Sequence, residues 1–122
     1  MSLLSWIDPT KLNFSGLSKN YSPVAIAFLR QNPQNIDWTN LSGNSCSEAI
    51  QLLSENLGNI NWTVLSANPC SEAIQLLREN PENIDWVALS GNLYPEALSL
   101  LETNPDAIDW FVLSQNPLIF TG

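Results

Sequence analysis

The chain of 122 residues has no histidine and few cations, and its charge is mostly of one sign. Twelve Asp and Glu residues stand against four Lys and Arg residues, which gives a net charge of −8. The four cations are scattered along the chain: Lys11, Lys19, Arg30 and Arg78. Proteins that bind nucleic acid or an anionic membrane face need clustered cations to contact the phosphates. We therefore expect neither nucleic acid nor a membrane as a partner.

The absence of histidine also removes the usual Cys/His zinc sites and Cys–His nucleophiles. The five glycines are scattered and form no phosphate-binding loop. Glutamates seven residues apart, such as Glu72 and Glu79, share a face of a helix, but a calcium site needs about six to eight oxygens that converge from a tight loop. We therefore expect a solvated acidic face, no metal ion, no cofactor and no enzymatic activity.

Long apolar runs are absent as well. No run approaches the ~20 residues that a transmembrane helix needs. Residues 1–6 are mostly apolar but too few for a signal peptide, and they lack a basic flank before Asp8 and Pro9. We therefore expect a soluble protein that stays on the reducing side of a membrane.

What the chain does contain is one phrase repeated five times at an interval of 24 residues. Each copy has an aromatic residue, two variable residues and then Leu-Ser-x-Asn. The aromatic residues are Phe14, Trp38, Trp62, Trp86 and Trp110. A strict period of this size is typical of solenoid proteins, in which each repeat is too small to bury its own apolar face and stacks on its neighbours. We call the set of equivalent positions in successive repeats a column.

The first half of each repeat has the pattern of an α-helix. In the best-preserved copy, Asn68 can cap the helix and Pro69 fits its first position. The apolar side chains that follow form one stripe: Ala73, Ile74, Leu76 and Leu77. Asn80 then tolerates a left-handed backbone, and Pro81 prevents the helix from continuing.

The second half of each repeat predicts a shorter helix, either α or 3-10. Asp85 suits its N-cap, and Trp86 and Leu89 have the spacing of a buried face. We expect a core of Ala, Ile and the two Leu of the long helix together with Ile, Trp and Leu of the second half. The tryptophans could alternatively form a stacking platform for a carbohydrate or a nucleotide, but their spacing favours the core. No window alternates with a period of two, so we expect no strands.

The two cysteines, Cys46 and Cys70, are 24 residues apart and fall in one column. Stacked helices lie about 8–10 Å apart, whereas a disulfide needs Cα atoms within about 7 Å. We therefore expect two thiols.

The full repeat reads Asn-Pro-x-x-x-Ala-Ile-x-Leu-Leu-x-x-Asn-Pro-x-x-Ile-Asp-Trp-x-x-Leu-Ser-x-Asn, best matched over residues 44–117, with a weaker copy at 9–33. It resembles a short repeat of proteins from large DNA viruses, including algal viruses. Its period is also similar to that of leucine-rich repeat variant proteins, which are right-handed superhelices of an α-helix alternating with a 3-10 helix. The Val-Arg-rich second half and the cysteine cluster of that family are missing here, so the resemblance implies only the architecture. The viral resemblance implies little more than an interaction role.

We thus predict an all-α fold, a right-handed α-solenoid of 24-residue repeats that each pair a long helix with a short α or 3-10 helix. One domain is expected over residues 1–122. Residues 1–13 form its N-terminal cap, with a degenerate helix over residues 1–8, and repeats follow at 14–37, 38–61, 62–85 and 86–109. Residues 110–122 form a partial repeat, in which residues 116–120 open a new long helix.

The recurrent Asn residues flank turns, which favours a capping role over the reading of a ligand. Candidate binding residues therefore lie in the columns that vary. Tyr21, Tyr94 and Phe111 are the plausible contact aromatics, because Tyr is enriched in binding patches. Leu118 and Phe120 leave the C-terminal end apolar, which would allow association through that end.

These observations predict a non-catalytic repeat scaffold that binds a protein or peptide partner. The alternative is a structural subunit of a virion or another large assembly, which would use its apolar end to contact a neighbour. A clean monomer in sedimentation would favour the first interpretation, and self-association would favour the second.

Overall fold

The computed structural model describes residues 3–121, and within this range all regular structure is helical and no strand is present. The α-helices are α1 (Phe14–Ser18), α2 (Pro23–Arg30), α3 (Trp38–Ser42), α4 (Ser47–Ser54), α5 (Trp62–Ser66), α6 (Ser71–Glu79), α7 (Trp86–Ser90), α8 (Pro95–Glu102) and α9 (Trp110–Ser114). The 3-10 helices are η1 (Pro9–Lys11), η2 (Pro33–Asn35), η3 (Leu57–Asn59), η4 (Pro81–Asn83), η5 (Pro105–Ala107) and η6 (Pro117–Ile119). The predicted all-α class is confirmed.

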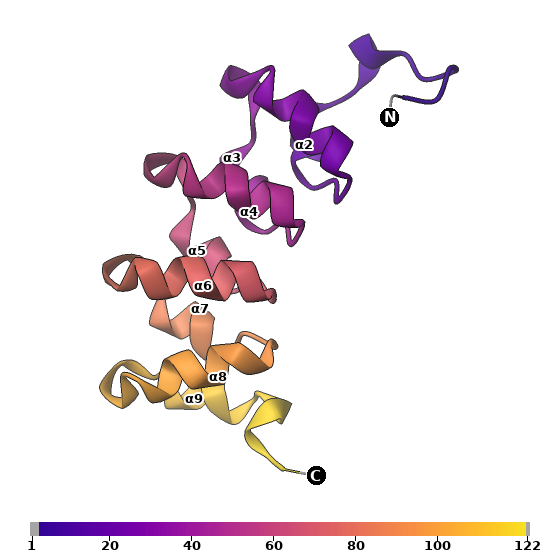
Figure 1. Cartoon of the computed structure of the whole chain (residues 1–122). Coiled ribbons are helices and arrows are strands. Elements are labelled where there is room, and N and C mark those ends of the chain that lie inside the picture. Colours follow the sequence, from indigo (N-terminus) through magenta and orange to yellow (C-terminus); the bar gives the residue numbers. More distant parts are fainter. Residues whose placement is uncertain (1–2, 122) are drawn as a thin grey trace. The chain divides into compact units, whose positions relative to one another are not determined.

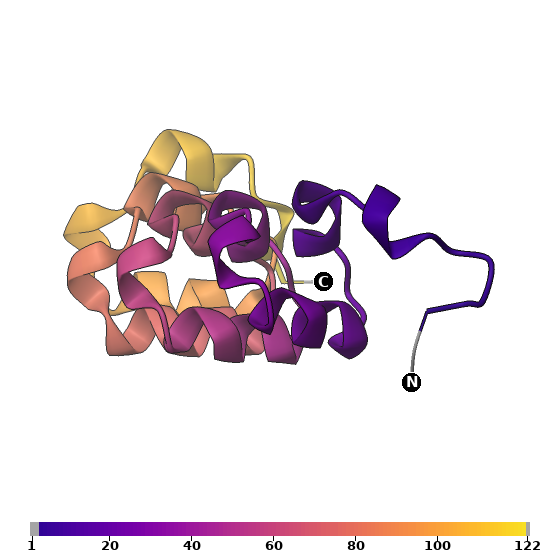
Figure 2. The same cartoon turned by 90° about the horizontal axis from the view of Figure 1, so that it is seen from above.

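The chain divides into two compact units, residues 1–60 and residues 61–122. In the first unit the long helix α2 contacts the long helix α4, and the short helix α1 contacts the short helix α3. In the second unit α6 contacts α8, and the short helix α7 contacts both α5 and α9. Each unit therefore has a layer of long helices beside a layer of short ones (Figures 1 and 2). The predicted packing of neighbouring helix pairs is confirmed in each unit.

The long helices begin later than predicted. Helix α6 starts at Ser71 and not at Pro69, because Cys70 occupies its N-cap and the Cys70 Sγ accepts a hydrogen bond from Ala73 N–H at 3.4 Å. In α2 the hydroxyl of Ser22 accepts the equivalent bond from Val24 N–H at 3.2 Å. The expectation that Asn68 caps this helix is therefore wrong.

The long helices end in a different way from the one predicted. Asn80 has a φ of −136°, outside the left-handed region, and its side-chain amide donates to the carbonyl of Leu76 at 2.9 Å. Asn32 and Asn56 donate in the same way to the carbonyls four residues earlier, at 3.0 and 2.8 Å. These bonds satisfy helix-end carbonyls that would otherwise have no partner. A 3-10 turn follows in each case.

The short helices are capped as predicted. The carboxylate of Asp85 accepts a hydrogen bond from Ala88 N–H at 3.1 Å. The same bond is made by Asn13, Asp37, Asn61 and Asp109 at the other short helices. The bond from Ala88, and then one from the Thr63 hydroxyl at 2.8 Å, lower the pKa of Asp85.

Asp85→Ala should cost about 1 kcal/mol of unfolding free energy at neutral pH, since this is typical of a lost N-cap. Asp85→Asn is the matched control, because Asn61 already fills this column; it should cost less than the alanine variant. A carboxylate with a lowered pKa stabilises the fold above its unfolded pKa and loses this contribution as the pH falls through the folded pKa. The gap between wild type and Asp85→Asn should therefore close in acid, as measured by urea denaturation between pH 7 and pH 2. A gap that widens in acid would contradict the role of the charge.

The apolar core matches the prediction except at the tryptophans. Its fully buried members include Leu29, Leu41, Leu53, Leu65, Ile74, Leu77 and Leu89. Trp38, Trp62 and Trp86 are only half-buried, and Trp110 is exposed. Each of them is the first residue of a short helix and lies at the edge of the core, while the leucine three residues later occupies its centre. The placement of Trp in the core is therefore wrong for Trp110 and only half right for the others.

Both ends of the described range differ from the prediction. The expected helix over residues 1–8 is absent from residues 3–8, where Ile7 N–H donates to the carbonyl of Leu4 in a single turn and Trp6 is exposed; residues 1–2 lie outside the described range. Pro9 disfavours a helical conformation at the residue before it, which explains the difference. The expected long helix at residues 116–120 is only the 3-10 turn η6, because Ile119 N–H bonds to Asn116 and no α-helical bond follows.

Candidate functional site

Buried serine and asparagine side chains connect successive repeats inside each unit. In the second unit the amide of Asn92 donates to the carbonyls of Ser66 and Asn68, at 2.9 and 3.1 Å, and its oxygen accepts from Tyr94 N–H at 2.9 Å. The hydroxyl of Ser90 donates to the carbonyl of Trp86. The same bonds recur at Ser18 and Asn44 in the first unit. These side chains are buried and engaged, so they present no array to a ligand.

The structure places the five candidate binding residues as follows. Tyr21 belongs to the first unit and is exposed, while the other four belong to the second unit. Tyr94 is half-buried at the N-cap position of α8, and Leu118 is half-buried in η6. Phe111 and Phe120 are exposed. Of the candidates in the second unit, only these two present most of their side chain to solvent.

One column of the short helices changes from polar to apolar along the second unit. The hydroxyl of Thr63 donates to the carboxylate of Asp85 at 2.8 Å, as Ser15 does to Asp37 in the first unit at 3.0 Å. The next two positions of this column are Val87 and Phe111, which cannot make the bond. Their side chains are 52% and 79% exposed.

We use the name apolar row for Val87, Trp110 and Phe111, which lie on α7 and α9. Trp110 is 62% exposed, and α7 contacts α9. Sequence reasoning selected only Phe111 of this set, because it assigned Trp110 to the core. The loss of the hydroxyl at Val87 is the sequence signal that would have found the rest.

A shallow groove of about 400 Å³ lies on the second unit between α6 and α8. Its lining residues are Arg78, Pro81, Ile84, Trp86, Leu100, Thr103 and Asn104. The groove combines a cation, a hydroxyl and an amide with apolar walls, which is the usual composition of a binding site. Sequence reasoning missed it. The available signal was Thr103, which stands in a column where Glu55 and Glu79 occupy the equivalent places.

The titratable groups of the first unit are paired with neighbours. Arg30 forms an ion pair with Glu55, with 2.7 Å between Nη1 and Oε1, and this contact lowers the pKa of Glu55. Cys46 and Cys70 remain thiols, as expected. Burial, and then a hydrogen bond from the Cys46 thiol to Glu48, raise the pKa of Cys46. A raised pKa makes Cys46 a weak nucleophile at neutral pH.

Within residues 3–121 no group of three or more Cys, Asp or Glu side chains is arranged to hold a metal ion. No helix of that part of the chain is long and apolar enough to cross a membrane.

Comparisons of the chain with protein-family models, with curated proteins and with solved structures find no match. The surfaces described above are therefore the basis for a functional proposal.

Proposed function

We propose that this chain is a non-catalytic repeat protein that binds a protein or peptide partner through the apolar row of its second unit. The observation that carries the proposal is the exposure of Val87, Trp110 and Phe111 on neighbouring short helices. Large apolar side chains that gather on an exposed surface mark sites of protein interaction. Trp and Phe are also enriched at the centres of such interfaces.

The regular hydrogen bonds between repeats support the role of a scaffold. In each unit the same serine and asparagine contacts recur, such as Asn44 with Ser18 in one unit and Asn92 with Ser66 in the other. A scaffold held by buried contacts leaves its outer columns free to vary without loss of the fold. We propose, on this basis, that the helix pairs within each unit are turns of a right-handed solenoid with a 24-residue repeat.

The second candidate is a structural subunit of a virion or another large assembly, in keeping with the resemblance to viral repeats. The observation that favours it is the exposure of Phe120 next to η6, in addition to the apolar row. In that case the surface would contact a further copy or a neighbouring subunit.

The double variant Val87→Thr, Phe111→Thr tests the proposal. Threonine is the residue of this column in α5, where Thr63 bonds to Asp85, so Val87→Thr can regain a bond to Asp109 and the fold should remain intact. We expect the wild-type chain to sediment as a monomer and to retain a defined set of proteins from an extract of its source organism. The double variant should lose at least about ninety per cent of that set, because hot-spot aromatics dominate such interfaces.

The matched control is Leu57→Thr, which removes an exposed apolar side chain from the first unit and should leave binding unchanged. Retention of the same proteins by the double variant would refute the apolar row as the contact surface. Self-association of the wild type that the double variant abolishes would establish the second candidate instead. Recovery of nucleic acid that salt removes would contradict both.

A further inference from the structure

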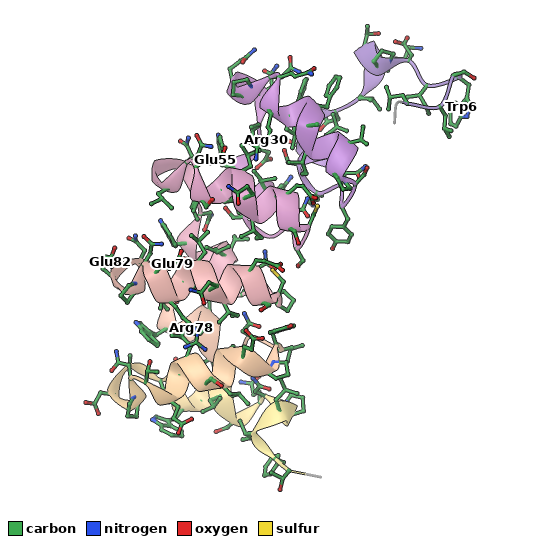
Figure 3. All side chains as sticks on the ribbon, viewed as in Figure 1. Trp6, Arg30, Glu55, Arg78, Glu79 and Glu82 are labelled. Carbon is green, nitrogen blue, oxygen red and sulfur yellow. The ribbon has the colours of Figure 1, made fainter. Side chains whose placement is uncertain are left out.

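The groove of the second unit contains an arginine that lacks the partner of its repeat equivalent. In the first unit Arg30 grips Glu55, 25 residues later, with 2.7 Å between Nη1 and Oε1 and 3.4 Å between Nη2 and Oε2. Arg78 is the equivalent of Arg30 in the second unit, and the residue 25 positions later is Thr103. Within residues 3–121 the Arg78 side chain makes no ion pair and no hydrogen bond. Figure 3 shows Arg78 on the side of α6 that faces α8.

Asn104, at the same groove, has also lost the bond of its equivalents. Asn32, Asn56 and Asn80 each donate their side-chain amide to the carbonyl four residues earlier. The corresponding carbonyl for Asn104 is that of Leu100, which accepts the Thr103 hydroxyl at 2.5 Å and Thr103 N–H at 3.1 Å. In the described part of the chain the Asn104 amide has no hydrogen-bond partner, and the residue is exposed.

A single residue therefore accounts for both vacant donors. Thr103 supplies no carboxylate to Arg78, and its hydroxyl occupies the carbonyl that Asn104 would use. The guanidinium and the amide line the same groove of about 400 Å³, beside the half-buried ring of Trp86 and the buried side chain of Leu100. A planar guanidinium binds a carboxylate through two parallel hydrogen bonds, and a side-chain amide can add a third.

We infer that this groove binds an Asp or Glu side chain of a partner peptide, with an apolar neighbour of that residue packed on Trp86 and Leu100. The inference rests on the proposed function and deepens it by naming the chemistry of the partner. The groove is open and its donors are side chains, whereas a peptide C-terminus is captured by a nest of backbone N–H groups. An internal acidic side chain is therefore the better fit.

The charges around the groove restrict the peptide further. The segments that line it also carry Glu79, Glu82, Glu102 and Asp106, all exposed, and the chain has a net charge of −8. Negative potential extends about 8 Å into solution at physiological salt and repels a polyacidic ligand. The matching peptide thus has one carboxylate, an apolar residue next to it, and basic residues beyond, which would face the surrounding acids.

A pair of synthetic peptides tests the inference directly. The first is acetyl-Lys-Leu-Glu-Leu-Lys-amide, and the second has Gln in place of Glu. Titration into isotope-labelled full-length protein should shift the NMR signals of the Arg78 side chain, the Asn104 amide and the Trp86 indole. The Gln peptide should bind at least about tenfold more weakly, because the charge-assisted pair is lost. Equal affinity of the two peptides would overturn the inference.

Three variants separate the site from general effects on the fold. Arg78→Ala should weaken the Glu peptide at least about tenfold. Thr103→Glu should abolish its binding without loss of stability, because it places a carboxylate against Arg78 in the register of Arg30 and Glu55. Thr103→Ala should stay within about threefold of wild type, since it supplies no such carboxylate. Wild-type affinity in the Thr103→Glu variant, with its fold verified by circular dichroism, would also overturn the inference.

The same variants distinguish this site from the apolar row. If extract proteins remain bound to Arg78→Ala and Thr103→Glu but are lost from the Val87→Thr, Phe111→Thr variant, and the peptides show no preference for Glu, the groove is overturned while the proposed function stands. If the Glu peptide shifts Arg78 as expected and the apolar-row variant retains every extract protein, the groove stands and the proposed contact surface is overturned.

Discussion

Asn92→Ala should destabilise the second unit by about 3–5 kcal/mol, because it leaves three buried backbone groups without partners and each such loss costs roughly 1–3 kcal/mol. These groups are the carbonyls of Ser66 and Asn68 and the N–H of Tyr94. Asn92 itself is 1% exposed, so water does not reach the site to replace the bonds. Urea denaturation followed by circular dichroism will measure the difference.

Asn104→Ala is the matched control, because it removes the same side chain from an exposed place where it makes no hydrogen bond in the described structure. It should change the unfolding free energy by no more than about 0.5 kcal/mol, the usual range for surface substitutions. Equal costs for the two variants would show that the buried amide does not hold the repeats together.

Asn92→Asp gives the same site a pH dependence. The introduced carboxylate would be buried and would face two carbonyl oxygens, so its pKa in the folded state should be raised. A carboxyl group with a raised folded pKa favours the fold in acid and destabilises it as the pH rises above its unfolded pKa. The deficit of this variant relative to wild type should therefore grow from pH 4 to pH 7.

The second large effect is expected at Leu89, whose side chain is fully buried in α7. Leu89→Ala should cost about 3 kcal/mol, within the range measured for leucine truncation in protein cores. Leu93→Ala is the matched control four residues later, because Leu93 is 61% exposed, and it should cost less than about 0.5 kcal/mol.

Trp86 is informative for the same comparison because it is the larger side chain but only half-buried. Trp86→Ala should fall below the roughly 3–5 kcal/mol typical of fully buried aromatic deletions. A cost for Trp86→Ala well above that range would place the tryptophan in the core, as the sequence pattern had suggested, and would contradict the structure.

Local chemistry was sufficient to predict the elements of this fold. The N-caps at Asp37 and Asp85 follow from a side-chain oxygen that reaches an N–H three residues later, and no distant contact is needed. The apolar stripe of the long helix likewise follows from the helical period. The helix starts were less predictable, because Asn68 and Cys70 both have cap chemistry and only the packed structure shows that Cys70 is the N-cap of α6.

The sequence by itself determined that this protein is all-helical, that its repeats are 24 residues long and that its chain is acidic, because these properties reside in single residues and their spacing. Only the tertiary structure decided which polar side chains are engaged. Arg30 meets Glu55 and Arg78 meets no acid across the same 25-residue interval, and Asn92 is buried while Asn104 is not. These outcomes depend on the contact between helices of successive repeats, and a contact between residues far apart in the chain has no local signature.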